Sequence, residues 1–129
     1  MGSKYLLDTS IIIDFLRQKD KANTHLYKLS LEDVSLYISI ITHTELYAGK
    51  RVWESKVAET ALNDLFDGLI IVPINTNISK NAGKIRSVYG IDLIDAIIAA
   101  TAIQEKLPML TLNTRHFNKI TGLKLGLIP

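Results

Sequence analysis

The chain has 129 residues, and at roughly 100 to 200 residues per domain this length predicts one domain, residues 1–129. Hydrophobic residues make up 47% of the chain and charged residues 22%, which excludes a disordered or fibrous protein. The lack of cysteine excludes disulfides, thiolate metal sites, iron–sulfur clusters and a cysteine nucleophile, so any metal must be bound by oxygen or histidine. The net charge of +2 does not by itself indicate a nucleic-acid-binding protein.

The sequence contains no candidate membrane span. Its longest uncharged and largely apolar run, Ala96–Ile103, is far shorter than the roughly 20 residues that a membrane-spanning helix needs. The first residues lack a basic segment followed by an apolar core, so we expect no secretory signal. These features predict a soluble, cytoplasmic protein without membrane contact.

Short apolar runs alternate with helical patterns in the first half of the chain. The pattern predicts a strand at Lys4–Asp8, helices at Ser10–Gln18 and about Lys21–Leu31, a strand at Ser35–Ile40, and helices at Thr42–Ala48 and Trp53–Phe66. Gly49 is expected to interrupt or end the helix that begins at Thr42. Asp67-Gly68 is expected to end the next helix.

The same alternation continues in the second half. The pattern predicts strands at Leu69–Val72 and Met109–Leu112, helices at Ser79–Tyr89 and Asp92–Lys106, and a short edge strand at Leu123–Leu125. Together the elements predict an α/β domain with a central, mostly parallel sheet of four or five strands and helices on both faces. Ligands bind such sheets beyond the carboxyl ends of the strands, so the polar residues at those ends are candidate site residues.

Asp8 follows the first strand, with three apolar residues before it and three after Thr9-Ser10. A buried carboxylate costs several kcal/mol unless it is paired, hydrogen-bonded or bound to a metal. The structural alternative is that Asp8 caps the first helix with help from Thr9-Ser10.

Glu45 lies in the first turn of the helix that follows the second strand. Thr42-x-x-Glu45 matches a capping box, which gives Glu45 a purely structural explanation. His43 in the same turn is a candidate surface or capping residue rather than a ligand.

Asp95 is one carboxylate in an otherwise apolar helix with many small residues, and such a helix is expected to be buried on most sides. Asp92 stands three residues earlier on nearly the same face. In the structural alternative Asp92 is the N-cap and Asp95 the third helical residue. In the functional interpretation Asp95 points to the same place as Asp8, and both carboxylates share a cation.

Asn113 follows the fourth strand, where we expect it to lie level with Asp8. Its alternative is ordinary turn chemistry. Arg115 and His116 follow in the same loop, where they can meet a phosphate or remain solvated.

Converging carboxylates repel each other, so this cluster requires protonation or a bound cation. Oxygen ligands without cysteine favour Mg²⁺ or Mn²⁺ over Zn²⁺. Such a site suits the attack of an activated water on a phosphodiester.

The residues around these positions resemble the PIN-domain nucleases, in particular the VapC-type toxins of prokaryotic toxin–antitoxin pairs. The similarity lies in four segments, Leu6–Ser10, Thr44–Leu46, Asp95–Ala102 and Thr111–Phe117. They occur in the order and spacing typical of the family and span nearly the whole chain. The resemblance implies a PIN-like fold and a metal-dependent endoribonuclease that acts as the toxin of a type II, VapBC-like pair.

The resemblance also implies a Mg²⁺ or Mn²⁺ site built from Asp8, Glu45 and Asp95, with water as the nucleophile. RNA is the implied substrate, and the implied partners are a second copy of the chain and a small VapB-like antitoxin whose tail blocks the site. In this mechanism Asp8 and Asp95 position the metal, and Glu45 holds it through water or polarises the attacking water.

The fourth acidic position of the family falls on Asn113, which adds no charge and favours a one-metal mechanism. Asp92 is a candidate to compensate for the missing charge. Ser10 and Arg115 are the candidate substrate contacts, and Arg115 is expected to steer the RNA backbone.

Other protein classes fit the sequence less well. A receiver-like domain needs an acidic phosphate acceptor after the third strand, where this chain has Val72-Pro73-Ile74-Asn75. An Asp-x-Asp phosphatase needs an acid at the position of Ser10. A catalytically weak or inactive PIN-like scaffold that binds RNA or protein stays an alternative, because Asn113 replaces an acid.

Overall fold

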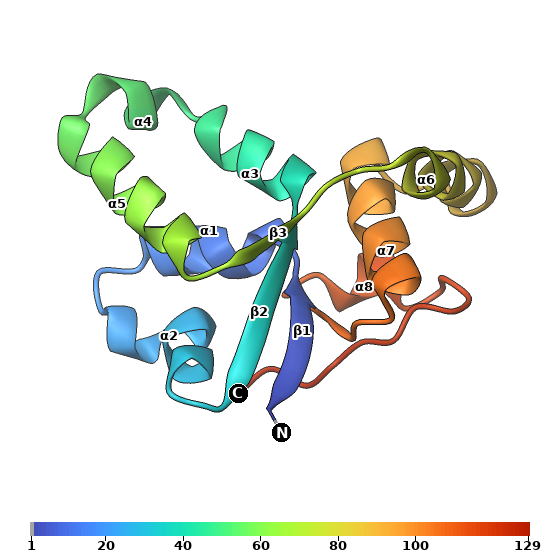
Figure 1. Cartoon of the computed structure of the whole chain (residues 1–129), viewed down its shortest axis with the longest axis horizontal. Helices are drawn as coiled ribbons and strands as arrows, with labels where there is room; N and C mark the ends of the chain where they lie inside the picture. The colour runs from blue at the N-terminus through green and yellow to red at the C-terminus, as the bar shows by residue number, and fades with distance from the viewer. Residues whose placement is uncertain (1) are drawn as a thin grey trace.

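A computed structural model describes residues 2–129 of the chain (Figure 1). The strands are β1 (Ser3–Leu7), β2 (Val34–Ser39), β3 (Ile70–Val72) and β4 (Met109–Leu110). The helices are α1 (Thr9–Arg17), the 3₁₀ turn η1 (Lys21–Asn23), α2 (His25–Ser30), α3 (Ile40–Tyr47), α4 (Lys50–Glu54), α5 (Lys56–Asp67), α6 (Thr76–Tyr89), α7 (Leu93–Glu105) and α8 (Thr114–Phe117). Within the described residues, no helix is both long enough and apolar enough to cross a membrane.

The four strands form one sheet in the order β3-β2-β1-β4, and every neighbouring pair is parallel. This confirms the predicted α/β class and the parallel sheet. The segment predicted as an edge strand, Leu123–Leu125, is not a strand and adds only a single bridge between Met109 and Leu125. The bridge forms because Met109 N donates to Lys124 O and accepts Gly126 N at its own carbonyl.

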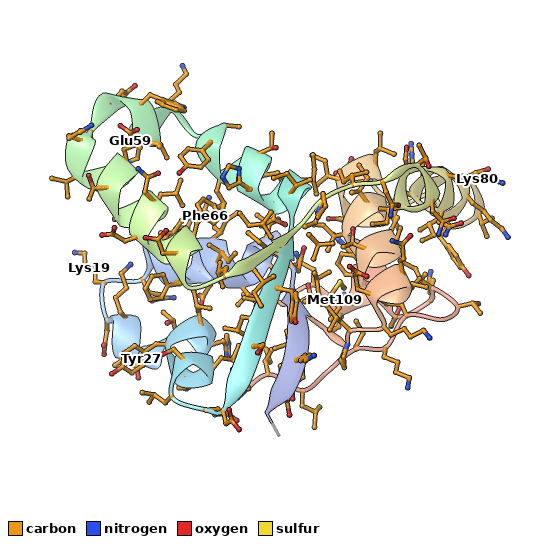
Figure 2. The ribbon with its side chains drawn as sticks, in the orientation of Figure 1. Lys19, Tyr27, Glu59, Phe66, Lys80 and Met109 are labelled. Carbon is orange, nitrogen blue, oxygen red and sulfur yellow. The ribbon has the colours of Figure 1, made fainter. Side chains whose placement is uncertain are left out.

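Helices cover both faces of the sheet. Figure 1 shows α1, α2 and α5 on one side of the strands and α6 and α7 on the other. Neighbouring strand residues point to opposite faces, so Leu6 packs in the core beside α6 and α7 while Leu7 packs in the core beside α1 and α2. Met109 belongs to the first core and Phe66 to the second (Figure 2). The period-two pattern of the strands therefore builds two separate apolar layers.

Several helices begin where a hydroxyl or amide side chain caps them rather than where the apolar pattern begins. Ser39 Oγ accepts from Ile41 N, so α3 begins at Ile40, two residues before the predicted start at Thr42. Because Thr42 is not the N-cap, the capping-box alternative for Glu45 does not hold. Ser55 Oγ accepts from Ala58 N, so the helix predicted over residues 53–66 is divided into α4 and α5.

Two further boundaries differ from the prediction for the same reason. Thr24 caps α2 and separates it from η1, which divides the helix predicted over residues 21–31. Asn75 Oδ1 accepts from Ile78 N, so α6 begins at Thr76, three residues earlier than predicted.

A left-handed turn joins α6 to α7. Gly90 ends α6 with φ +70°, a conformation that glycine adopts without strain. The Arg86 guanidinium donates to the carbonyls of Gly90 and Ile91 at 2.8 and 3.0 Å. This bonded turn sets the direction in which α7 starts.

Candidate active site

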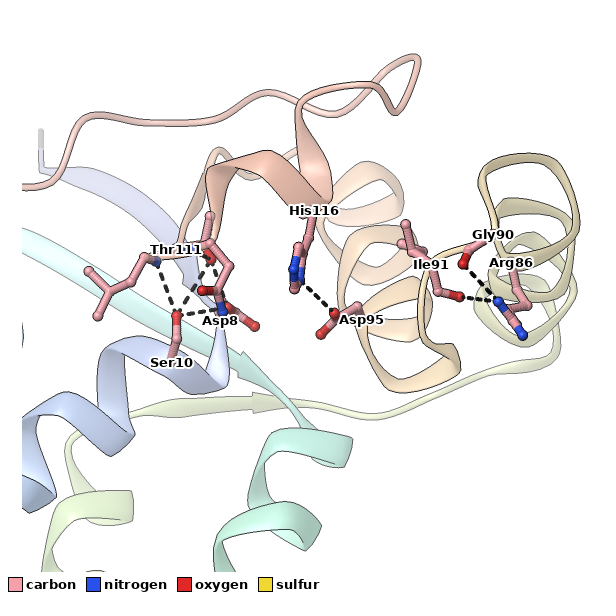
Figure 3. Close-up of polar contacts among 10 residues, drawn as sticks. Asp8, Ser10, Arg86, Gly90, Ile91, Asp95, Thr111 and His116 are labelled. Carbon is pink, nitrogen blue, oxygen red and sulfur yellow. Dashed lines mark hydrogen bonds and ion pairs between the residues drawn. The ribbon is translucent and has the colours of Figure 1, made fainter.

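The carboxyl ends of β1, β2 and β4 meet at one edge of the sheet, and the start of α7 faces them. Figure 3 shows Asp8 after β1, Thr111 after β4 and Asp95 in the first turn of α7 gathered there. Glu45 comes from α3, the helix that follows β2. The parallel topology thus brings together side chains from four separate segments of the chain.

Asp8 is buried, with 3% of its surface exposed. Its Oδ2 accepts hydrogen bonds from Ser10 Oγ at 2.8 Å and from Thr111 Oγ1 at 2.7 Å. Asp8 occupies the N-cap position of α1, but its side chain caps no backbone N–H. Across residues 2–129, no basic side chain forms an ion pair with Asp8. The carboxylate is therefore held by hydroxyls and lacks a compensating positive charge.

The register of β4 decides which residue lies level with Asp8. Leu7 pairs with Leu110, and Asp8 N donates to Leu110 O at 2.9 Å. Thr111 therefore stands beside Asp8, and the prediction that placed Asn113 there is wrong because β4 ends earlier than predicted. Asn113 is exposed at the start of α8, and its side chain makes no capping bond.

The two hydroxyls that hold Asp8 are themselves fixed by backbone groups. Leu112 N donates to Ser10 Oγ at 3.1 Å, and Asn113 N donates to Thr111 Oγ1 at 2.9 Å. Ser10 was a predicted substrate contact, yet its hydroxyl is engaged inside the protein. The network ties the start of α1 to the segment that leads into α8.

Asp95 is the third residue of α7, and its side chain is 25% exposed. Burial raises the pKa of the Asp95 carboxyl above its usual value, and the negative charges of Asp8 and Asp92 raise it further. The imidazole of His116 opposes these effects and lowers the pKa of Asp95. Asp92 is exposed at the N-cap position, and its side chain makes no capping bond. The capping alternative is therefore right about both positions, but no capping hydrogen bond accounts for the Asp92 side chain.

Glu45 is half-buried and is held by a threonine that follows Asp8 directly. Thr9 Oγ1 donates to Glu45 Oε1 at 2.6 Å and lies 3.0 Å from Thr42 Oγ1. Sequence reasoning missed Thr9, although its position beside Asp8 and before an apolar helix was visible. Glu45 thus joins the site through a hydroxyl that bridges α1 and α3.

Arg115 and His116 lie on the single-turn helix α8, not in the loop that the sequence predicted. The Arg115 side chain is exposed and, in the part of the chain that the structure describes, forms no ion pair. His116 Nδ1 lies 3.5 Å from Asp95 Oδ2 (Figure 3). The segment predicted as a loop is therefore helical and borders the site beside Asp95.

The donor set suits a hard divalent cation in charge and in ligand type. Asp8 has no cationic partner and Asp95 is destabilised by the charge of Asp8, so a positive ion between them would relieve both. Among residues 2–129, however, no three acidic or histidine side chains stand close enough to bind one ion together. The structure brings Asp8 and Asp95 into electrostatic contact and leaves Glu45 bonded to Thr9.

Comparisons with known proteins agree with this architecture. The sequence profile of the PIN domain matches residues 5–123. Ribonuclease VapC19 of Mycobacterium tuberculosis is 35% identical over 117 residues, which cover 87% of this chain and 90% of that protein. Ribonuclease VapC1 of Methanocaldococcus jannaschii is 33% identical over 130 residues, which cover 95% and 87%. A chain of a toxin–antitoxin complex from Klebsiella pneumoniae superposes with a TM-score of 0.75 at 29% identity, covering 92% of this chain and 94% of that chain.

Proposed function

The chain belongs to the PIN-domain family, and we propose that it is an endoribonuclease and the toxin of a VapBC-type toxin–antitoxin pair. The observation that carries the proposal is the uncompensated, hydroxyl-held Asp8 beside Asp95 at the carboxyl edge of the sheet. The relatives named as VapC ribonucleases align over most of their length with this chain, which supports the same reaction here.

Mg²⁺ or Mn²⁺ is the proposed cofactor, with Asp8 and Asp95 as its direct ligands and Glu45 acting through water. When bound, the ion supplies positive charge that makes a water more acidic and offsets charge that develops on the scissile phosphate. The support is the chemistry of the residues, because carboxylate oxygens without sulfur are the donors that these ions prefer.

The chain's own residues fix the geometry of the reaction. Ser10 and Thr111 hold the Asp8 carboxylate in one orientation, so it needs no reorganisation when substrate arrives. Thr9 occupies Glu45 Oε1, which leaves Oε2 as the atom that we assign to a hydrogen bond from the attacking water. Arg115 is the proposed electrostatic contact with the RNA backbone, and Asn113, two residues earlier, contributes a neutral amide.

The assembly is proposed from the same relationship. A small antitoxin is the expected partner because the matched structure from Klebsiella pneumoniae is a toxin–antitoxin complex. A homodimer and a cytoplasmic location complete the proposal. A catalytically inactive PIN scaffold is the alternative. It is favoured by Asn113 and by the finding that, among residues 2–129, no three acidic or histidine side chains stand close enough to bind one ion together.

Cleavage of a mixed RNA pool with Mg²⁺ or Mn²⁺ tests the function. We expect cleavage by the wild type that is lost with EDTA and in Asp95→Asn, while the control Asp64→Asn, on the exposed surface of α5, cleaves normally. Circular dichroism establishes that each variant is folded. Absence of cleavage by the folded, metal-supplemented wild type, over all RNAs in the pool, would favour the inactive scaffold.

A further inference from the structure

His116 sits at the edge of the proposed active site, with its ring next to Asp95 and largely exposed. Its Nδ1 lies 3.5 Å from Asp95 Oδ2, and 60% of its side chain is exposed (Figure 3). The two nitrogens of an imidazole are distinct, and contact through one leaves the other available to a second partner. With Nδ1 directed at Asp95, Nε2 is the nitrogen available to a ligand.

The ring is placed on the rim by a fixed piece of backbone. Phe117, the next residue, is 1% exposed and anchors α8 in the core beside α7. His116 N donates to Asn113 O at 3.0 Å, and Asn113 N bonds Thr111 Oγ1, whose hydrogen is donated to Asp8. The bonds that orient Asp8 therefore also hold the helix that carries His116.

The other two histidines have ordinary structural surroundings. His25 Nδ1 bonds the carbonyl of Pro129, and His43 packs against the rings of Tyr47 and Phe66. Within residues 2–129, His116 alone among the histidines pairs with an acidic side chain. A largely exposed imidazole gains little stability from such a contact, so folding does not explain its position.

We infer that His116 is a substrate-binding residue whose Nδ1 faces Asp95 and whose Nε2 bonds an oxygen of the RNA backbone next to the scissile bond. The inference rests on the proposed ribonuclease function. Contacts to backbone oxygens fix the register of a nucleic acid without reading its sequence. Because one ring contacts both Asp95 and the RNA, His116 would add a backbone contact that holds the RNA in the site next to the scissile bond.

Substitutions that imitate one ring nitrogen at a time separate this role from a structural one. The amide nitrogen of His116→Gln reaches about as far as Nε2, while that of His116→Asn reaches only about as far as Nδ1. We expect His116→Ala and His116→Asn to raise KM for RNA by about 3- to 10-fold, the effect of losing one hydrogen bond. His116→Gln should keep KM near the wild-type value, and kcat should change by less than about threefold in all three variants.

Calorimetric titration with Mn²⁺ in the absence of RNA gives a second readout. Removing an imidazole that competes for Asp95 should leave Mn²⁺ affinity unchanged or increase it, whereas damage to the site should weaken the binding of both Mn²⁺ and RNA. The control His25→Ala should leave KM, kcat and Mn²⁺ affinity at wild-type values.

Two results would overturn the inference. One is an unchanged KM in His116→Ala, and the other is a joint loss of RNA and Mn²⁺ binding that His116→Gln does not rescue. If the wild type and His25→Ala cleave no RNA, the proposed function itself fails. Substrates with single 2′-deoxy nucleotides beside the scissile bond distinguish the atom contacted: a raised KM in the wild type but not in His116→Ala identifies a ribose hydroxyl, and an equal effect in both identifies a phosphate oxygen.

Discussion

The two central carboxylates of the site are held in contrasting ways. Asp8, at the end of β1, is buried and receives two hydroxyl hydrogen bonds on one oxygen. Asp95, in the first turn of α7, is partly exposed, and within residues 2–129 the one polar partner of its side chain is the His116 imidazole. Asp8 is thus held by hydrogen bonds at the end of the sheet, whereas Asp95, at the start of the facing helix, has a single long contact.

This difference suggests separate tasks for the two acids. Hydrogen bonds to the charged form stabilise a carboxylate in one orientation, so Asp8 is a fixed reference point. Asp95 carries the cost of burial and of repulsion by Asp8, and that cost disappears when a cation or a substrate-bound ion arrives. Asp8 therefore fixes the position at which a cation would bind, and the binding of that cation would stabilise the charged form of Asp95.

The largest expected effect on RNA cleavage comes from removing the negative charge of Asp8. Asp8→Asn keeps an oxygen for the Ser10 and Thr111 hydroxyls but loses the negative charge. We expect RNA cleavage to fall by more than about 100-fold, since even outer partners of metal ligands are worth about 10- to 100-fold. The melting temperature should stay the same or rise, because a buried, unpaired charge is removed.

Cleavage assays and thermal denaturation measure these two changes. The control is Asp14→Asn, which removes a neighbouring acid of α1. A large drop in melting temperature that accompanies the loss of cleavage would mean that Asp8 is chiefly a structural residue.

Loosening the fixed carboxylate without removing its charge should have the next largest effect. Thr111→Val deletes the 2.7 Å hydrogen bond to Asp8 and keeps a side chain of similar shape. We expect cleavage and Mn²⁺ affinity to fall by about 10- to 100-fold, the range found for outer partners of metal ligands. Thr60→Val on the exposed surface of α5 is the control. Wild-type cleavage by Thr111→Val would show that Asp8 needs no hydroxyl to hold it.

The sequence predicted the fold well because the fold follows from local patterns. Alternating apolar residues such as Leu6 and Leu7 specify which face of a strand is buried, and alternating strands and helices specify a parallel sheet. The errors lie at boundaries such as Ser39 and Ser55, where one capping side chain ends a pattern that hydrophobicity alone would continue.

The site was predictable at Asp8 and Asp95, where a carboxylate interrupts an apolar segment. The residues that orient them were not, because Thr111 bonds Asp8 across 103 positions and Thr9 bonds Glu45 across 36. Their identification depends on strand register, and a shift of two residues exchanges Thr111 for Asn113. Local sequence patterns do not contain that information.

The left-handed turn at Gly90 sets the start of α7, so changing this turn is a third test of the contrast between Asp8 and Asp95. Gly90→Ala places a Cβ at φ +70° and should destabilise the fold by about 1 to 2 kcal/mol. The matched control is Gly83→Ala inside α6, where a Cβ meets open space and should stabilise the fold by about 0.5 to 1 kcal/mol. We expect Gly90→Ala to reduce cleavage modestly as Asp95 shifts. Urea denaturation measures the change in the free energy of unfolding for each variant. If both variants change it in the same direction, the left-handed turn at Gly90 is not the cause of the change in Gly90→Ala.

The smallest expected effect is the pH dependence of folding stability that Asp95 causes. The pKa of Asp95 is raised above 3.8, chiefly by burial, so the folded state binds its proton more tightly than the unfolded chain. The free energy of unfolding should therefore fall as pH rises from about 3.8 through the raised pKa, a loss that Asp95→Asn avoids. The melting-temperature advantage of Asp95→Asn over the wild type should grow as the pH rises from about 3.8 through the raised pKa, and it should shrink again when Mg²⁺ is added. Asp64→Asn should show no such growth. An advantage of Asp95→Asn that stays constant with pH would mean that Asp95 is no more strained than an ordinary surface acid, and the contrast with Asp8 would then rest on hydrogen bonding alone.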